Sequence, residues 1–364
     1  MNSNLSSEDF AILLALESNP FMPMTELATL LGITRVTAKK RVDDLKERDI
    51  IRTPIAIYNL QSLGLNRINV LAFVNSIEKL RILELACNEH PYTHYRARAY
   101  GGQFGLFMQF DAPEKTTNQI DEFFRKLVKE NIILQYELLP SIGIRNDIYA
   151  DLSRYNAKMS SWTFSWEDWF TSLENEKSSL PDKQKISDNF TVFQQSHFKI
   201  LRMLTANASI KQTDIIEKLK LSRTQTHREY NYVMENYIER IRFIYNREIF
   251  DLTETYIAIG SDLDKNKSDQ IFSTINNNPP PFRLALDLIE NNQILLWGNM
   301  TPAQASSFAF SMWRAISSTQ IYTLDTKKSR LYWFYPENFD FQTMDWKTSK
   351  DYVIKDPLNR TLSK

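Results

Sequence analysis

The first fifty residues have apolar side chains at helical spacing, followed by short stretches that alternate in the manner of β-strands. Within residues 6–52 the apolar positions recur every three or four residues, which predicts helices over 6–18, 25–31 and 34–48. The stretches 50–53 and 55–58 then favour two short strands. Three helices followed by such a pair are typical of a winged helix-turn-helix unit.

Local signals support these helix boundaries. Ser6 and Asp9 have the spacing of a capping box, Gly32 supplies a tight turn, and Thr34 is a suitable N-cap for the third helix. Three apolar side chains of this third helix are spaced to face a core: Ala38, Val42 and Leu45.

The pattern then changes to strands alternating with amphipathic helices. Strands are predicted over 68–75, 93–100, 104–110 and 132–138, and helices over 78–89 and 116–129. The order is therefore βαββαβ, which is that of a ferredoxin-like domain.

The chain repeats this plan. At an offset of 188 residues, Phe10–Arg52 aligns with Phe198–Arg240 without a gap and with 11 identities in 43 positions. Two unrelated helical segments matched by chance are the alternative, but the later elements follow in the same order. Strands are predicted over 255–260, 283–289, 293–298 and 320–324, and helices over 264–276 and 302–316.

The outer face of each third helix is a candidate for reading DNA. We expect Arg35, Thr37, Arg223 and Gln225 to reach base edges, and Lys39, Lys40, Arg41 and Arg228 to meet phosphates. Glu229 replaces Arg41 in the second copy, which is therefore less basic, and a solvated helix face is the alternative interpretation. The full candidate set is Thr34, Arg35, Val36, Thr37, Lys39, Lys40 and Arg41, with Ser222, Arg223, Thr224, Gln225, His227 and Arg228.

Composition narrows the class of protein. The 44 basic and 44 acidic residues give no net charge, so any attraction to nucleic acid must be local. A single cysteine, Cys87, fits a reducing compartment, and the apolar runs are too short to cross a membrane, so we expect a cytoplasmic protein without a membrane partner. Phosphate-loop and metal motifs are not recognised, so we predict no cofactor and no enzymatic activity.

The pairing of these units resembles a known family. The stretch from Leu30-Leu31-Gly32-Ile33-Thr34-Arg35 to Ile50, followed by Leu60-Gln61-Ser62-Leu63-Gly64-Leu65, resembles the signature of the Lrp/AsnC (feast/famine) regulators. The resemblance implies a winged helix-turn-helix followed by a ferredoxin-like (RAM/ACT-like) sensory domain that dimerises through its sheets. A tandem chain is similar to an archaeal variant in which one polypeptide supplies both halves of a pseudo-dimer.

The resemblance also implies an effector site at the turn between the second and third strands. Three glycines lie within five residues there, and bare backbone amides suit a carboxylate. The family's usual acidic residue is replaced by Gln103, which argues against amino-acid sensing, and a plain hairpin turn is the alternative. The candidate effector residues are Gly101, Gly102, Gln103 and Phe104, with Asn291, Asn292 and Gln293 in the second half.

An enzyme remains as a minor alternative. Siroheme decarboxylases resemble the same fold and carry histidine, arginine and tyrosine on the strands around this turn. His94, Arg96 and Tyr100 match that pattern in part, but the turn Gly-Gly-Gln-Phe departs from the aromatic–Asn–x–Trp type of those enzymes.

Two aromatic-rich segments complete the chain, Trp162–Phe170 and Leu331–Tyr335, and we expect each to pack against the neighbouring half. The fold class is therefore α+β, with two winged helix-turn-helix domains alternating with two ferredoxin-like domains. In chain order, the expected domains are a helical domain (1–58), a sensory domain (59–145), and an aromatic extension with a linker (146–190, the linker at 175–185). A second helical domain (191–250), a second sensory domain (251–327) and a C-terminal extension (328–364) follow.

The function expected from these features is that of a transcription regulator. It would bind double-stranded DNA as an internal pseudo-dimer and respond to a small-molecule effector. Further assembly of these pseudo-dimers into homo-oligomers is left open. The competing hypothesis is a ligand- or protein-binding module whose helix-turn-helix units no longer bind DNA.

Overall fold

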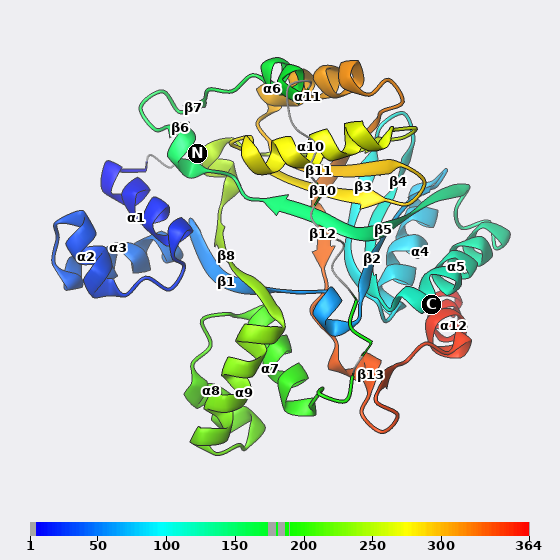
Figure 1. The fold of residues 1–364 in the computed structure, drawn as a ribbon, viewed down its shortest axis with the longest axis horizontal. Helices are drawn as coiled ribbons and strands as arrows, with labels where there is room; N and C mark the ends of the chain where they lie inside the picture. Colours follow the sequence, from blue (N-terminus) through cyan, green and yellow to red (C-terminus); the bar gives the residue numbers. More distant parts are fainter. Residues whose placement is uncertain (1–4, 174–179, 181–185, 189, 364) are drawn as a thin grey trace.

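Two three-helix units project from a closed eight-stranded barrel in the computed structural model of this chain (Figure 1). The structure describes residues 5–173, 180, 186–188 and 190–363, so the predicted linker 175–185 lies outside it apart from residue 180. The mixed α+β class predicted from the sequence is confirmed. None of the helices in the described part of the chain is long and apolar enough to cross a membrane.

The first helical unit follows the predicted boundaries closely. The Ser6 hydroxyl accepts from the Asp9 amide and the Asp9 carboxylate accepts from the Ser6 amide, which completes the capping box. Gly32 ends the second helix at a φ of +65°, and the Thr34 hydroxyl accepts from the Thr37 amide. The helices are α1 (Ser7–Ser18), α2 (Met24–Leu31) and α3 (Arg35–Glu47).

The second unit repeats this arrangement with one difference at the turn. Lys220 occupies the left-handed conformation, at a φ of +54°, that Gly32 takes in the first unit. Ser222 caps the third helix by accepting from the Gln225 amide, as the sequence predicts. The helices are α7 (Gln195–Ala206), α8 (Gln212–Leu219) and α9 (Arg223–Asn236).

The predicted wings do not form within either unit. Residues 51–58 make one strand, β1 (Ile51–Tyr58), which pairs in antiparallel fashion with β8 (Ile238–Tyr245) of the other half. The prediction of two short strands was wrong because Pro54, which lacks an amide hydrogen, interrupts the ladder without ending the strand. We call this pair, residues 51–58 and 238–245, the ribbon.

The elements of the barrel occur in βαββαβ order twice. The first set is β2 (Asn66–Phe73), α4 (Ile77–Glu89), β3 (Thr93–Tyr100), β4 (Phe104–Ala112), α5 (Thr117–Lys129) and β5 (Gln135–Ile148). The second set is β9 (Glu254–Gly260), α10 (Lys265–Asn277), β10 (Arg283–Ile289), β11 (Gln293–Met300), α11 (Pro302–Ala315) and β12 (Gln320–Leu331).

The two predicted sheets are joined into one barrel rather than forming separate domains. The strand order is β10-β11-β9-β12-β3-β4-β2-β5, closed by the antiparallel pairs β12·β3 and β10·β5. The last strand of each set is longer than predicted because its additional residues pair with the other half, as Asn146 does opposite Leu286. Apolar side chains from both halves, including Leu71, Phe107 and Ile257, fill part of the barrel interior.

The aromatic extensions cross between halves, as expected from the sequence. The Trp162 indole donates to the Phe250 carbonyl at 2.9 Å, and the Trp346 indole donates to the Leu63 carbonyl at 2.9 Å. The extensions also reach the helical units, because Tyr155 packs against Phe10 of α1 and Trp346 against Phe198 of α7. Their short elements are β6 (Tyr155–Asn156), β7 (Ser161–Trp162), α6 (Trp166–Ser172), β13 (Phe339–Asp340), β14 (Asp345–Trp346) and α12 (Asp356–Leu362).

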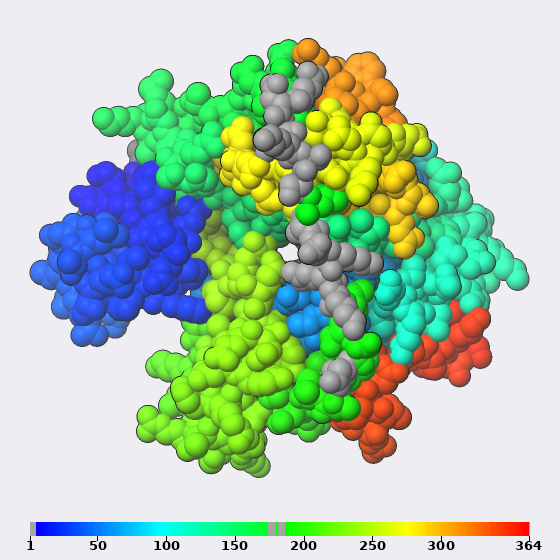
Figure 2. Space-filling model, viewed as in Figure 1, coloured from blue at the N-terminus to red at the C-terminus, as the bar shows by residue number. Residues whose placement is uncertain are grey.

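The ribbon holds the two helical units apart. Because the strands are antiparallel, α3 leads into one end of the ribbon and α9 into the opposite end. Eight residues at about 3.3 Å each give a ribbon of ~25 Å. On the face shown in Figure 2, a notch separates the first unit from the second.

Candidate functional sites

The predicted DNA-reading residues lie on exposed faces of α3 and α9. On α3, Thr34, Arg35, Val36, Thr37, Lys39 and Lys40 are exposed, and on α9 the exposed residues are Ser222, Arg223, Thr224, His227 and Arg228. Val36, the one apolar side chain of this set, is 78% exposed. Gln225 and Arg41 are only partly exposed.

The basic residues of α3 differ in how far their charge is available. Among the described residues, no ion pair involves Arg35, Lys39 or Lys40. Arg41 instead points back toward α1, where its Nη1 lies 3.3 Å from the Asp9 carboxylate. Its assignment as a phosphate ligand is therefore weakened, because the carboxylate neutralises part of its charge.

Helix α9 carries a buried acid where α3 has this arginine. Glu229 was expected on the outer face, but it is 2% exposed and lies 2.5 Å from His197 Nε2. Arg228 also donates to this carboxylate, at 2.8 Å. At the offset of 188 residues, His197 corresponds to Asp9 and Glu229 to Arg41, so the two units make a contact at the same pair of positions, with the carboxylate on the other helix.

Burial sets the protonation of this second pair. It lowers the pKa of His197 below its ordinary value, even though the neighbouring Glu229 acts in the opposite direction. For Glu229, burial raises the pKa but is outweighed by hydrogen bonds from Arg228 and by His197, so the pKa is lowered. The pair therefore consists of a carboxylate and an imidazole that resists protonation.

The two turns predicted to bind an effector are exposed hairpin turns. Gly102 has a φ of +81°, and Asn291 and Asn292 have φ values of +58° and +57°. A side chain at Gly101 would meet the Ile321 carbonyl at 2.5 Å, so this glycine permits the approach of β12. Phe104 is 70% exposed.

Polar side chains of these turns contact other protein groups. Gln103 accepts from Gln135 at 3.3 Å, and Gln293 donates to Ser261 at 3.3 Å. The described cavities are lined by other residues, and effector binding at the turns stays a prediction.

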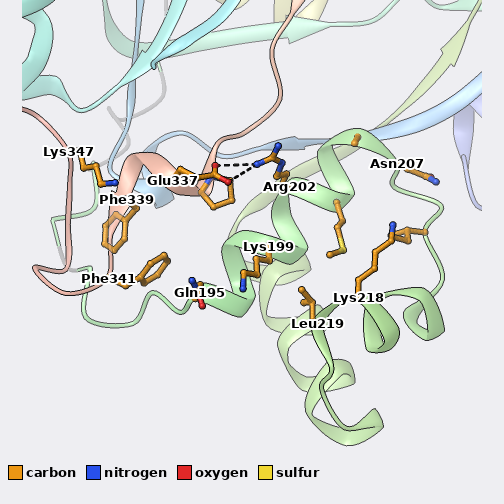
Figure 3. A pocket seen from close by; sticks show the side chains of 14 residues that line it. Gln195, Lys199, Arg202, Asn207, Lys218, Leu219, Glu337, Phe339, Phe341 and Lys347 are labelled. Carbon is orange, nitrogen blue, oxygen red and sulfur yellow. Dashed lines mark hydrogen bonds and ion pairs between the residues drawn. The ribbon is translucent and has the colours of Figure 1, made fainter. Parts of the chain in front are cut away.

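A cavity of about 630 Å³ opens between the second helical unit and the C-terminal extension (Figure 3). Its apolar lining includes Met203, Leu219, Phe339 and Phe341. Its charged lining comprises Lys199, Arg202, Lys218, Lys347 and Glu337, of which Arg202 and Glu337 are paired at 3.0 Å.

No motif in the sequence predicts this cavity, although the repeat contains a signal for it. The positions that correspond to Lys199, Arg202 and Lys218 in the first unit are Ala11, Leu14 and Leu30. The second unit therefore has three cations around a groove whose counterpart positions are apolar.

A buried network of four polar side chains lies where β1 meets the first half of the barrel. Arg67 forms two hydrogen bonds of 2.7 Å to Asp111, and the Tyr58 hydroxyl donates to the same carboxylate at 2.6 Å. His94 Nδ1 lies 3.0 Å from Asp111 and 3.1 Å from the Tyr58 oxygen. Sequence analysis singled out His94 alone among these residues.

Burial and neighbouring charges determine the protonation states of the residues in this network. Arg67 and His94 overcome the effect of burial and lower the pKa of Asp111 far below its ordinary value. Burial lowers the pKa of His94 despite the adjacent carboxylate, and it raises the pKa of Tyr58 well above 10. The network therefore offers a neutral imidazole and a protonated phenol beside a carboxylate.

Arg96 and Tyr100, the other residues of the siroheme decarboxylase pattern, do not take part in the network around His94. Arg96 and Arg98 pair with Glu84 of α4, at 3.0 and 2.9 Å, and Tyr100 is 47% exposed at the end of its strand. The histidine, arginine and tyrosine that the sequence placed on one strand therefore face different surroundings.

The helical units match a family model described as winged helix-turn-helix DNA-binding, over residues 9–52 and 193–228. The first range contains all but the first two residues of α1 and the whole of α2 and α3, and the second contains α7, α8 and the first six residues of α9. The comparison with curated proteins found no match.

Solved structures with a similar fold include the siroheme decarboxylase NirDL, at 14% identity, 90% coverage of this chain, 95% coverage of that chain and a TM-score of 0.54. The same enzyme in complex with an iron-uroporphyrin III analogue gives 14% identity, 91% and 96% coverage, and a TM-score of 0.55. AsnC from E. coli is 20% identical over 37% of this chain and 91% of its own length, with a TM-score of 0.30.

These likenesses correct one prediction from the sequence. The chain was predicted not to be an enzyme, but the structures that share its fold over nine-tenths of its length are those of an enzyme. At this identity the likeness establishes the fold alone.

Proposed function

We propose that this protein is a sequence-specific, DNA-binding transcription regulator that reads two half-sites with α3 and α9. The observation that carries the proposal is the placement of two helix-turn-helix units, each matching a DNA-binding family model, at opposite ends of one ribbon. The exposed N-terminal turns of both helices suit entry into major grooves about one helical turn, ~34 Å, apart.

Different residues have different roles in this proposal. Arg35 and Thr37 on α3 and Arg223 on α9 project from the turns that enter the groove, and we assign them to base edges. Lys39 and Lys40 lie further along α3 and are assigned to phosphates. Gln225 is half-buried, which reduces its share of base contacts.

Regulation by a small molecule is part of the proposal. The cavity beside α7 and α8 has a volume within the range of ligand sites and borders the second reading unit directly. A ligand there would contact both this unit and the C-terminal extension that joins it to the barrel.

The test is a titration of the protein against genomic DNA fragments at two salt concentrations. A steep loss of affinity with salt together with site preference supports the proposal, and no binding at low salt refutes it. Arg35→Ala is expected to relax sequence preference, whereas Lys40→Ala weakens all sequences alike. Lys46→Ala, an exposed change in the last turn of α3, serves as the matched control and leaves affinity unchanged.

The fold favours a second candidate function, tetrapyrrole decarboxylation of the siroheme type. The network of Tyr58, His94, Asp111 and Arg67 supplies proton-carrying groups. Three of these residues, Tyr58, His94 and Asp111, line a cavity of about 20 Å³, which would have to open to admit a tetrapyrrole. Incubation with siroheme, followed by mass spectrometry for loss of carboxyl groups, tests this candidate. Product formed by the wild type and abolished in His94→Ala supports it, and an unchanged substrate rejects it.

A further inference from the structure

Five arginines gather where the barrel meets the ribbon. They come from two barrel strands, from the ribbon strand β8, and from the residues that follow β8. Their guanidinium groups are partly buried, and the only carboxylate that contacts more than one of them in the described structure is Asp147. The arginines are Arg145, Arg240, Arg242, Arg247 and Arg283.

Asp147 neutralises one part of this group. Its carboxylate lies 3.0 Å from Arg283, 3.4 Å from Arg240 and 3.8 Å from Arg145. These arginines lower the pKa of Asp147 far below its ordinary value although burial opposes them. Arg240 also lies 3.6 Å from the Glu239 carboxylate, so two carboxylates face these three guanidinium groups.

Arg242 and Arg247 form no ion pair within 4.0 Å among the described residues, although Asp147 still attracts Arg242 from a longer distance. Burial, with a smaller contribution from the nearby Arg283, lowers the pKa of Arg242 to about 10. Burial and Arg283 likewise lower the pKa of Arg247. Both groups are therefore held as cations against burial and against a neighbour of like charge.

An aromatic side chain lies against the same cations. The ring centre of Tyr149 is 4.5 Å from the Arg240 guanidinium carbon and 5.2 Å from those of Arg242 and Arg283. Such contacts are favourable, but they leave the positive charge in place.

Two hydrogen-bond donors in this group are unused. The Tyr149 hydroxyl and Arg240 Nε are both buried and have no hydrogen-bond partner among the described residues. Buried polar groups in proteins are nearly always satisfied, and buried charges are normally paired. An oxygen acceptor would satisfy the unused donors, and one that carries negative charge would also neutralise the cations without an ion pair.

We propose that this arginine cluster binds a small, multiply charged oxyanion, either a polycarboxylate or a phosphate compound. Its oxygens would accept from Tyr149 and Arg240 and would neutralise Arg242 and Arg247. The site joins β8 of the ribbon to β5 and β10 of the barrel, so the bound anion fastens the ribbon to the barrel. The proposal does not depend on DNA binding.

The experiment measures binding of two probes, citrate and inorganic pyrophosphate, to the full chain without DNA. Isothermal titration and thermal unfolding are carried out at low ionic strength, with sodium chloride added to equalise ionic strength between samples. The variants are Arg242→Gln and Arg247→Gln, and Arg81→Gln, an exposed change on α4, is the control.

We expect at least one probe to bind the wild type and the control equally and to raise their melting temperature. Each cluster variant is expected to bind at least tenfold more weakly. In buffer without the probe, Arg242→Gln melts at the same temperature as the wild type or higher, because a repulsion between cations is removed. The probe that binds more tightly distinguishes a carboxylate ligand from a phosphate ligand.

Three outcomes overturn the proposal: neither probe binds the wild type, the variants bind as tightly as the wild type, or Arg242→Gln lowers the melting temperature without a probe. The last outcome would assign Arg242 to the fold rather than to a ligand. Because DNA is absent, none of these results bears on the proposed regulator function.

Discussion

At the scale of single residues, the contrast between the two helical units shows how a duplicated core contact diverges. The first unit joins α1 to α3 through Asp9 and Arg41, and the second joins α7 to α9 through His197 and Glu229. The carboxylate lies on α1 in the first unit and on α9 in the second, where it faces an imidazole whose pKa is lowered by burial. The second unit therefore has a buried carboxylate at the position that Arg41 occupies in the first unit.

The exchanged pair gives a testable prediction. Glu229→Arg alone places a buried cation beside His197 and is expected to lower the free energy of unfolding by about 3–5 kcal/mol. The double variant His197→Asp/Glu229→Arg restores the contact of the first unit and is expected to recover most of the loss. Chemical denaturation of the four proteins of this double-mutant cycle measures the coupling, and additive effects would contradict the idea of an exchanged pair.

A second residue-scale prediction concerns His90, which is 4% exposed and lies against the rings of Phe110 and Phe123, at 4.9 and 5.0 Å. Burial lowers its pKa to about 3, with a smaller contribution from Arg360. The unfolded chain therefore binds a proton that the folded chain excludes between about pH 6.5 and pH 3.

Stability is thus expected to be complete above about pH 6.5 and to fall by about 1.4 kcal/mol per pH unit below it, as far as this residue is concerned. The measurement is the pH dependence of the unfolding free energy for the wild type and for His90→Gln. The variant should show a shallower decline, and identical slopes would mean that His90 accepts a proton in the folded protein.

At the scale of elements, the sequence predicts local structure far better than pairing. Helix caps at Ser6, Thr34 and Ser222 depend on residues three positions away, so the sequence pattern shows them directly. The partner of β1 lies almost 190 residues further along the chain. The alternation of apolar and polar residues predicts a strand, but it does not show which other strand will pair with it. The closed barrel was missed for the same reason.

The candidate sites divide in the same way. The outer faces of α3 and α9 follow from helical periodicity, and most of the predicted side chains are exposed there, with Arg41 and Gln225 only partly so. The arginine cluster draws residues from β5, β8 and β10, and the Tyr58 network draws them from β1 to β4. A set assembled across several strands leaves no spacing in the sequence that could reveal it.

The first aromatic extension leads to a prediction about stability at the scale of elements. Trp166 of α6 is fully buried and packs against Phe164, Phe282 and Phe308, with the Phe308 ring centre 4.9 Å away. Trp166→Ala is expected to lower the free energy of unfolding by about 3–5 kcal/mol because it leaves a cavity. Trp313→Ala, on a side chain that is 59% exposed, is the control and is expected to change stability by less than about 0.5 kcal/mol. Equal losses in denaturant titrations would show that the extension does not form part of the core.

At the scale of the whole molecule, the two halves contact each other through the ribbon, the barrel and the aromatic extensions. The ribbon, both barrel seams and both aromatic extensions connect residues of one half with residues of the other. We therefore expect the two halves to unfold together in one cooperative transition.

The halves are nevertheless unequal toward DNA, which leads to a prediction for the proposed regulator. Arg35 has Lys39 and Lys40 on the same exposed face, whereas Arg223 is followed by Arg228, which is paired with Glu229. Arg35→Ala is expected to cost about 1–3 kcal/mol of binding free energy and Arg223→Ala clearly less. Gel-shift titrations on one selected site measure both changes, and a larger effect of Arg223→Ala would reverse the assigned order of the half-sites.

The ribbon has one more consequence. In a regulator assembled from two identical chains, either subunit can occupy either half-site, and the complex looks the same from both directions along the DNA. Here β1 always pairs with β8 of its own chain, so α3 and α9 are permanent and distinguishable partners. A DNA-bound molecule would therefore have a direction, and inverting its site would turn the aromatic α11 face, with Phe310 and Trp313 exposed, toward the opposite flank of the DNA. Orientation of the site, and not only its position, would then decide which neighbouring proteins this chain can meet.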